Sequence, residues 1–331
     1  MPSSCLITGA TGFVGGHLVH TCVERGWSTR ALVRAGTDAA PLERSGVAVL
    51  RGDLTEPATL PAAVDGVDVI FHCAAKVGDW GPVEDYRTVN VAGLRALLDA
   101  CRDKPVKRFV HLSSLGVYAA RHHFGTDETE PLPKHHVDGY TQTKVESEQL
   151  ALSHAREHGF PVVVLRPGFI YGPQDRTVLP KLIHALRRRR VRYLGDNGRA
   201  MNTIYVGNLI DAMFRAAEEP RAVGQVYNLT DGEAVSKRRF LEALADGMGI
   251  PRPRPLPVPL WFARPLARLL EARARKQGSA EAPVLTQARV KFLGLNLDFS
   301  IEKARRELGY RPRVSFDEGM RQTVDWYKKN A

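Results

Sequence analysis

Near its N-terminus the chain reads Cys5-Leu6-Ile7-Thr8-Gly9-Ala10-Thr11-Gly12-Phe13-Val14-Gly15-Gly16. The apolar run ending at Thr8 predicts a strand, and the apolar spacing of residues 18–23 predicts a helix after the glycine-rich turn. Glycines let a backbone approach a pyrophosphate, and the N–H groups and dipole of a helix start favour its negative charge. The spacing G-x-x-G-x-x-G therefore indicates a dinucleotide cradle, although such turns also serve purely as tight connections.

Strand and helix patterns alternate through the first half of the chain. Strands are predicted at 6–8, 29–33, 48–51, 67–72, 108–113 and 162–166, and helices at 15–25, 57–64, 88–102 and 143–157. This alternation predicts an α/β fold of Rossmann type, a doubly wound parallel sheet with helices on both faces. Ligands of such sheets bind at the carboxyl ends of the strands.

The sequence changes character near Gly168, where prolines and glycines become frequent. We predict a dinucleotide-binding domain over residues 1–167 and a smaller C-terminal substrate-binding domain over 168–331. Some later segments are expected to return to the first domain. A proline-rich connection at 251–259 leads into an apolar helix at 260–273 that also carries arginines, and two short helices are predicted between 299 and 327.

The composition is that of an ordinary globular protein, with 331 residues, 44% hydrophobic and 25% charged. The four cysteines lack metal-type spacing, so we expect reduced thiols and no metal. No secretory signal or membrane-spanning run is visible, and we expect a cytoplasmic protein that associates at most peripherally with a membrane. The net charge of +11 includes the run Arg187–Arg190, but no stacking aromatics are interleaved with it, so no nucleic-acid partner is expected.

The second informative motif is Tyr140-Thr141-Gln142-Thr143-Lys144. On a helix, a spacing of four places two side chains on one face, and a nearby ammonium favours a phenolate and lowers the tyrosine pKa. The pair then forms a general acid/base. Ser113 and Ser114 end the preceding predicted strand, where a hydroxyl can hydrogen-bond a reacting oxygen.

Taken in order, these motifs resemble the extended short-chain dehydrogenase/reductase superfamily, which includes the NAD-dependent epimerases and dehydratases. The resemblance spans essentially the whole chain and is greatest to the branch of the 3β-hydroxysteroid dehydrogenases and sterol-4-carboxylate 3-dehydrogenases. It rests on Gly9/Gly12/Gly15, Asp53-Leu54, Cys73-Ala74-Ala75-Lys76 with Asp79-Trp80-Gly81, Asn90, Ser113-Ser114, Tyr140-x-x-x-Lys144, Arg166-Pro167-Gly168-Phe169-Ile170-Tyr171-Gly172-Pro173, Asn202–Asn208 and the tail 299–312.

The resemblance implies a catalytic role for four residues. Tyr140 would exchange a proton with the reacting oxygen, Lys144 would lower the Tyr140 pKa and hold the nicotinamide ribose, and Ser114 would hydrogen-bond the substrate oxygen. Ser114 is preferred to Ser113 because it lies four residues before Tyr118. Asn90 either supports Lys144 through water or is a backbone-bonding helix residue.

The family's cofactor contacts can also be transferred to this chain. They would fall on Gly9, Thr11, Gly12, Phe13, Val14, Gly15, Arg34, Asp53, Leu54, Ala74, Ala75, Lys76, Tyr140, Lys144, Pro167 and Gly168. An acidic residue at the end of the second strand excludes a 2′-phosphate, whereas this chain has Arg34 there, which can pair with that phosphate. We therefore expect NADP(H), with NAD(H) as the alternative.

The substrate is expected to be a hydrophobic alcohol or ketone in a largely apolar pocket. Trp80, Phe169 and Tyr171 are the candidate walls, with ordinary packing as the alternative. The segment 256–275, with apolar, aromatic and arginine residues, is either an interfacial helix that contacts a membrane or a lid helix.

We predict a 3β-hydroxysteroid or sterol dehydrogenase-like oxidoreductase, which decarboxylates its product if the substrate carries a 4-carboxylate; Lys76 is the candidate partner for that group. Three alternatives stay open: a 3-oxoacid or dihydroflavonol-type reductase, a nucleotide-sugar epimerase or dehydratase, and a non-catalytic dinucleotide-binding sensor or scaffold. The last is disfavoured because Ser114, Tyr140 and Lys144 are all present. Homodimerisation through helices of the first domain is common in the superfamily and is a further possibility.

Overall fold

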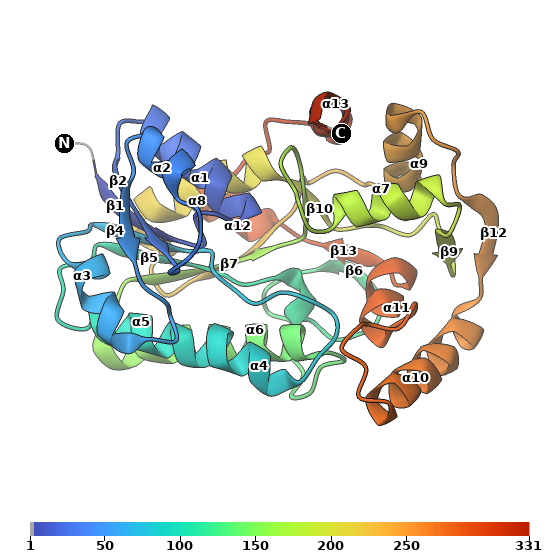
Figure 1. The fold of residues 1–331 in the computed structure, drawn as a ribbon, viewed down its shortest axis with the longest axis horizontal. Helices are drawn as coiled ribbons and strands as arrows, with labels where there is room; N and C mark the ends of the chain where they lie inside the picture. Colours follow the sequence, from blue (N-terminus) through green and yellow to red (C-terminus); the bar gives the residue numbers. More distant parts are fainter. Residues whose placement is uncertain (1–2, 331) are drawn as a thin grey trace.

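A seven-stranded parallel sheet forms the centre of the protein in a computed structural model, which describes residues 3–330 (Figure 1). The strand order is β11-β7-β5-β4-β1-β2-β3, and each neighbouring pair runs parallel. The strands are β1 (Ser4–Thr8), β2 (Ser28–Val33), β3 (Ala48–Arg51), β4 (Val69–His72), β5 (Arg108–Leu112), β7 (Val162–Pro167) and β11 (Val226–Leu229). Every residue of β4, β5 and β7 is buried, as expected for a sheet covered on both faces.

Helices cover both faces of this sheet (Figure 1). One face carries α1 (Phe13–Glu24), α8 (Val206–Glu218) and α12 (Glu302–Leu308). The other carries α3 (Leu60–Val64), α5 (Gly93–Cys101) and α6 (Gly139–His158), with α2 (Ala40–Arg44) and α4 (Val83–Arg87) near the edges. The doubly wound Rossmann-type α/β prediction is therefore confirmed.

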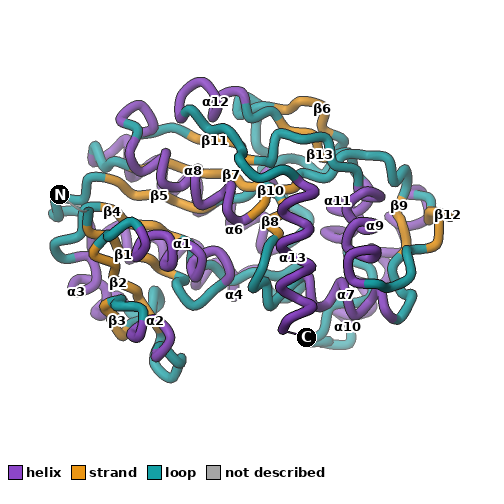
Figure 2. Tube along the Cα trace, turned by 90° about the horizontal axis from the view of Figure 1, so that it is seen from above, coloured by secondary structure: helices purple, strands orange, loops and turns teal. Residues whose placement is uncertain are grey.

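A smaller region lies beyond the carboxyl ends of the strands (Figure 2). Its short two-stranded pairs are β8 (Phe169–Tyr171) with β10 (Thr203–Tyr205), β9 (Arg192–Leu194) with β12 (Arg254–Val258), and β6 (His123–Thr126) with β13 (Leu297–Phe299). Its helices are α7 (Leu179–Arg187), α9 (Lys237–Met248), α10 (Leu260–Lys276), α11 (Gln287–Gly294) and α13 (Phe316–Asn330).

The two regions are not separated cleanly along the chain. Strand β11 pairs with β7 in the central sheet, and α8 packs against α1, although both follow residue 168. The proline-rich connection contains β12, and the second tail helix is longer than expected, at 15 residues. No helix within residues 3–330 has the length and apolar character needed to span a membrane.

Candidate active site

The glycine-rich turn joins β1 to α1 through unusually close backbone contacts. Gly9 has a φ of +74°, and an added Cβ there would lie 2.8 Å from the Ala74 nitrogen. A Cβ on Gly15 would lie 2.1 Å from the Gly9 carbonyl oxygen. Helix α1 begins at Phe13 with no side-chain cap, and the N–H groups of a first helical turn lack partners within the helix. The turn that holds Gly9, Thr11, Gly12, Phe13, Val14 and Gly15 therefore fits the pyrophosphate of a dinucleotide.

Two arginines lie at the ends of the neighbouring strands β2 and β3. Arg34 follows β2 and is exposed, while Arg51 ends β3 opposite Val33. Arg51 Nη1 donates to the carbonyl oxygens of Arg34 (3.2 Å) and Thr37 (2.8 Å). Two guanidinium groups thus lie at the edge where an adenine ribose binds in folds of this type.

Asp53 and Leu54 follow β3. The Asp53 carboxylate accepts hydrogen bonds from Thr55 N (2.9 Å) and Thr55 Oγ1 (2.8 Å). Leu54 is buried against Gly93 in the helix layer. The pair shapes the edge of the cradle next to the arginines.

Asn90 holds the loop that follows β4, which contains Ala74, Ala75 and Lys76. Its side chain accepts from Lys76 N (2.7 Å) and donates to Lys76 O (3.1 Å) and Thr143 Oγ1 (3.0 Å). It lies in a π-helical turn at Thr88–Ala92, a feature frequent at functional sites. Asn90 therefore bonds backbone groups, which was one of the two interpretations, and those groups belong to Lys76. Among the described residues, it makes no direct hydrogen bond to Lys144. The Lys76 ammonium pairs with Asp85 at 3.0 Å.

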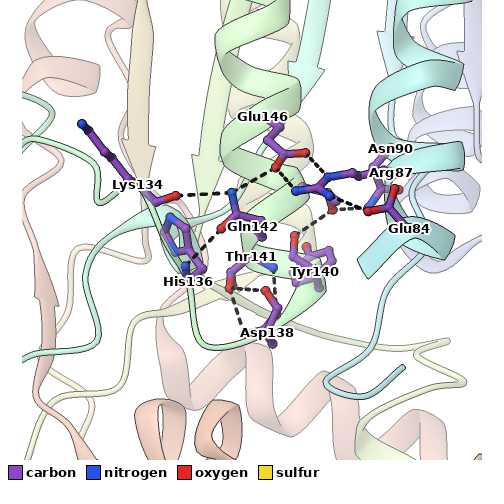
Figure 3. Close-up of polar contacts among 11 residues, drawn as sticks. Glu84, Arg87, Asn90, Lys134, His136, Asp138, Tyr140, Thr141, Gln142 and Glu146 are labelled. Carbon is purple, nitrogen blue, oxygen red and sulfur yellow. Dashed lines mark hydrogen bonds and ion pairs between the residues drawn. The ribbon is translucent and has the colours of Figure 1, made fainter. Parts of the chain in front are cut away.

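Tyr140 and Lys144 lie on α6. A capping aspartate, Asp138, fixes the first turn of this helix (Figure 3). Asp138 Oδ1 accepts from Thr141 N at 2.8 Å. Lys144 is buried, and its Nζ lies 5.9 Å from the centre of the Tyr140 ring. Lys144 Nζ donates to the carbonyl oxygen of Leu112 at 2.6 Å, which ties α6 to the carboxyl end of β5.

The expected lowering of the Tyr140 pKa by Lys144 is not found. Burial and the Asp138 charge raise the pKa of Tyr140 to about 12, and only the Ser114 hydroxyl lowers it. Burial lowers the pKa of Lys144 to about 8. A spacing of four indicates that the two groups are close, but it carries no information on how strongly both are desolvated.

The two serines after β5 have different surroundings. Ser113 is buried, and its hydroxyl donates to Glu148 Oε2 at 2.8 Å. Glu148 is paired in turn with Arg166, whose Nη1 donates to the Tyr118 hydroxyl at 2.7 Å. Ser114 is half-buried, and its Oγ accepts from Gly116 N at 3.0 Å, so its proton is available to another acceptor.

Of the residues that end or follow β7, some lie near the candidate site and others lie in the hydrophobic core. Pro167 ends β7, and a Cβ on the following Gly168 would lie 1.9 Å from the Asn202 carbonyl oxygen. Phe169 is half-buried, with its ring centre 5.1 Å from that of Phe292 on α11. The prediction that Tyr171 forms a substrate wall is wrong, because its side chain is fully buried in an aromatic core of Tyr205, Phe240 and Phe316.

Trp80 lies in the loop between β4 and α4 and is half-buried. Its Nε1 donates to Ser279 O at 2.9 Å, and the Arg275 guanidinium lies 5.5 Å from its ring centre. Neighbouring Asp79 accepts from Thr286 Oγ1 (2.9 Å) and pairs with Arg289 (2.7 Å). The sequence analysis did not predict the partners of Asp79, which are separated from it by more than 200 residues.

Lys291 on α11 is a residue that the sequence analysis missed. Its Nζ donates to the carbonyl oxygens of Gly116 and Tyr118, both at 2.7 Å, so it holds the turn that begins at Ser114. Burial lowers its pKa to about 8, and the Asp138 carboxylate acts in the opposite direction. Helix α11 therefore reaches the catalytic candidates from the C-terminal region.

Comparison with known proteins agrees with this geometry. Residues 5–230 match the NAD dependent epimerase/dehydratase family. The chain is 39% identical over 317 residues to a 4-hydroxy-2-methyl-3-oxo-4-farnesyl-3,4-dihydroquinoline-1-oxide ketoreductase of Stigmatella aurantiaca, covering 95% of this chain and 93% of the relative. It is 33% identical to a 2-alkyl-3-oxoalkanoate reductase of Stenotrophomonas maltophilia, with 96% and 97% covered.

A plant relative and a solved structure extend the comparison. The 3beta-hydroxysteroid-dehydrogenase/decarboxylase isoform 1 of Arabidopsis thaliana is 31% identical, with 97% of this chain and 79% of the relative covered. The crystal structure of gox2253 superposes with a TM-score of 0.82 at 28% identity, covering 99% of each chain. The chain belongs to the NAD dependent epimerase/dehydratase family, that is, to the extended short-chain dehydrogenases/reductases, and is an NAD(P)-dependent oxidoreductase of that family.

Proposed function

We propose that this enzyme interconverts a ketone and a secondary alcohol on a hydrophobic substrate that is not a nucleotide sugar. The observation that carries the proposal is the grouping of Ser114, Tyr140 and Lys144 at the carboxyl end of β5, two strands away in the sheet from the glycine-rich turn after β1. Because Glu148 engages the Ser113 hydroxyl, Ser114 is the serine left to bind a substrate oxygen. These residues are the ones we assign to catalysis, and Asn90 is assigned to positioning.

The bound nicotinamide supplies or accepts a hydride. Tyr140 carries its proton at neutral pH, as a tyrosine of ordinary pKa also does, and would donate that proton to the oxygen of a ketone. The Ser114 hydroxyl would donate to the same oxygen and fix its orientation. Lys144, anchored on Leu112 O and on the same helix as Tyr140, would hold the nicotinamide ribose.

The substrate class follows from the relatives and from the apolar surroundings. The names of the three relatives compared above specify a 3-oxo group on a farnesylated dihydroquinoline-1-oxide, a 3-oxo group on a 2-alkylalkanoate and a 3β-hydroxyl on a steroid. Phe169 and Phe292 lie together between β8 and α11, where they would contact such a group. We favour a cyclic ketone or sterol-like substrate, with a 2-alkyl-3-oxoacid as the second candidate. The most specific reaction within the favoured class is the oxidation of a 4-carboxysterol followed by loss of its carboxylate as carbon dioxide.

We propose NADP(H) as the preferred cofactor, supported by the two exposed arginines at the ends of β2 and β3. A 2′-phosphate carries charge that Arg34 and Arg51 can pair with, and β2 is followed by no acidic residue that would repel it before Asp38.

Replacement of Tyr140 by Phe tests the function directly. The Tyr140→Phe enzyme should bind NADPH with unchanged affinity while ketone reduction falls roughly 10²–10⁴-fold, because the proton donor is lost. Nicotinamide absorbance measured with 3-ketosteroids, a 2-alkyl-3-oxoacid and UDP-sugars would identify the substrate. Conversion of a UDP-sugar without net cofactor change, and no reduction of any ketone, would overturn the proposal.

A further inference from the structure

Helix α10 lies at the end of the molecule farthest from the N-terminus (Figure 1). It exposes several large apolar side chains. The exposed fractions are 78% for Trp261, 50% for Phe262 and 66% for Leu269. On the adjacent strand β12, Leu256 is 81% exposed. With 100° of rotation per residue, the three helical side chains fall within one third of the helix circumference. We call this surface, together with Leu256, the α10 apolar face.

Basic residues flank the apolar face on both sides. The exposed cations of the helix are Arg264, Arg268, Arg273, Arg275 and Lys276. The helix contains one acidic residue, Glu271, which is 3% exposed. It accepts from the backbone and side chain of Gln287 and from Arg275 Nη2 at 3.3 Å. The exposed half of α10 therefore combines aromatic and aliphatic groups with five cations, of which Arg275 is paired with the buried Glu271. This is the pattern of a helix that lies in a membrane interface.

The opposite side of α10 packs on β9 and α11. Ala263 and Ala267 are buried against Leu194 and Val290. The connection that follows the helix is bonded to the loop after β4 through Ser279 and Trp80. Helix α11, which packs against α10, in turn holds the turn that begins at Ser114 through Lys291.

We propose that the α10 apolar face docks this enzyme on an anionic lipid surface, so that a membrane-dissolved substrate enters the site from the bilayer. The route for the substrate rests on the proposed function, whereas the docking itself does not. Charge complementarity favours lipid over a second copy of this chain, because two copies would bring the same five cations on each helix together.

The test uses the full-length protein and flotation with vesicles of phosphatidylcholine, with and without phosphatidylglycerol. Binding is expected only with phosphatidylglycerol and should weaken at high salt. The double variant Trp261→Ser/Leu269→Ser should lose at least about tenfold in binding because it removes two inserted side chains. Arg268→Gln and Arg273→Gln should each weaken binding to the phosphatidylglycerol vesicles roughly fivefold.

Matched controls alter similar residues elsewhere. Val223→Ser removes an apolar side chain that is 42% exposed, and Arg188→Gln/Arg190→Gln removes two exposed arginines from the other basic run. These variants should bind like the parent protein. Equal binding to both vesicle types, or loss of binding in the controls but not in the α10 variants, would overturn the docking. Sedimentation showing a dimer that the α10 substitutions dissociate, without vesicle binding, would assign the face to a second copy instead.

Reduction of a short, water-soluble 3-oxoacid without vesicles separates this proposal from the proposed function. Vesicle binding without reduction of any ketone overturns only the proposed function. Reduction without vesicle binding overturns only the docking. Tyr140→Phe should still float with the vesicles, since Tyr140 is remote from the apolar face in sequence and belongs to the sheet region.

Discussion

The dinucleotide side and the substrate side of the site are held together in different ways. On the dinucleotide side, backbone packs on backbone, as where Gly15 closes on the Gly9 carbonyl and β1 pairs with β4. On the substrate side, side chains such as Asp79, Trp80 and Lys291 bridge segments that are 170–210 residues apart. The first arrangement cannot change without moving strands, whereas the second opens when a few polar bonds break. The substrate side is therefore the one able to move during turnover.

The two sides also differ in how deeply their ion pairs are buried. Arg166–Glu148 is almost completely buried beneath Ser113, with side chains 5% and 2% exposed. Arg289–Asp79 links the substrate side with side chains that are 38% and 31% exposed. A buried charge left alone is costly, while a partly solvated one is not.

The largest expected effect is that of Arg166→Met. This change leaves the Glu148 carboxylate buried with only neutral donors, and should lower the free energy of unfolding by about 3–5 kcal/mol. The matched change Asp79→Asn should lower the free energy of unfolding by about 1 kcal/mol or less. Urea denaturation of both variants measures the difference, and equal losses would show that the two sides do not differ in this way.

Gly15→Ala probes the backbone contact of the dinucleotide side. The added Cβ would meet the Gly9 carbonyl oxygen at 2.1 Å, so we expect a loss of about 1–3 kcal/mol in stability and much weaker NADPH binding. Gly16→Ala is the control, because its Cβ would lie 3.7 Å from the nearest atom, at ordinary contact distance. Calorimetry and fluorescence titration of NADPH report the two effects, and a Gly15→Ala protein that binds NADPH normally would contradict the proposed cradle.

The dinucleotide side should also control stability at acid pH. His72 is buried at the end of β4, stacked on His111 with ring centres 5.5 Å apart. Burial lowers the pKa of His72 to about 3, and the Lys144 charge acts in the same direction. Below the ordinary value of 6.5, the unfolded chain binds a proton that the folded chain does not, so stability is lost as the pH falls from 6.5 toward 3.

At pH 5 this loss amounts to about 2 kcal/mol for His72 alone, since 1.5 pKa units separate that pH from 6.5. Urea denaturation at pH 7.5 and pH 5 measures it. The pH dependence should shrink by that amount in His72→Gln and persist in His20→Gln, which changes an exposed histidine of α1. An unchanged pH dependence in His72→Gln would exclude this origin.

The contrast between the two sides also explains what sequence reasoning could reach. Strand–helix alternation and the turn at Gly9–Gly15 are local patterns, so six sheet strands and the cradle were predictable. Tyr140 and Lys144 are one helical turn apart, so their proximity was predictable too. The partners of Asp79 and Lys291 are set by tertiary packing, for which no pattern in a single sequence exists. Tyr171 was misassigned because an aromatic residue after a strand looks the same whether it lines a pocket or fills the core.

The smallest of these effects is expected at Lys291, on the substrate side. Lys291→Met removes the ammonium group that donates to the carbonyl oxygens of Gly116 and Tyr118, and this loosens the turn that begins at Ser114. We expect kcat/KM for ketone reduction to fall about tenfold, equivalent to about 1.4 kcal/mol, with the loss mainly in kcat and NADPH affinity unchanged. Lys291→Arg should restore part of the activity.

Lys237→Met is the matched control, because this buried lysine also donates to two carbonyl oxygens, those of Ala200 and Leu295. If Lys291 merely stabilises the fold, both variants should lose stability and leave the kinetics of the folded protein unchanged. If Lys291 positions Ser114, only Lys291→Met should change kcat. A fall in kcat confined to that variant would show that the substrate side, although held by few bonds, sets the geometry of a hydroxyl carried by the sheet.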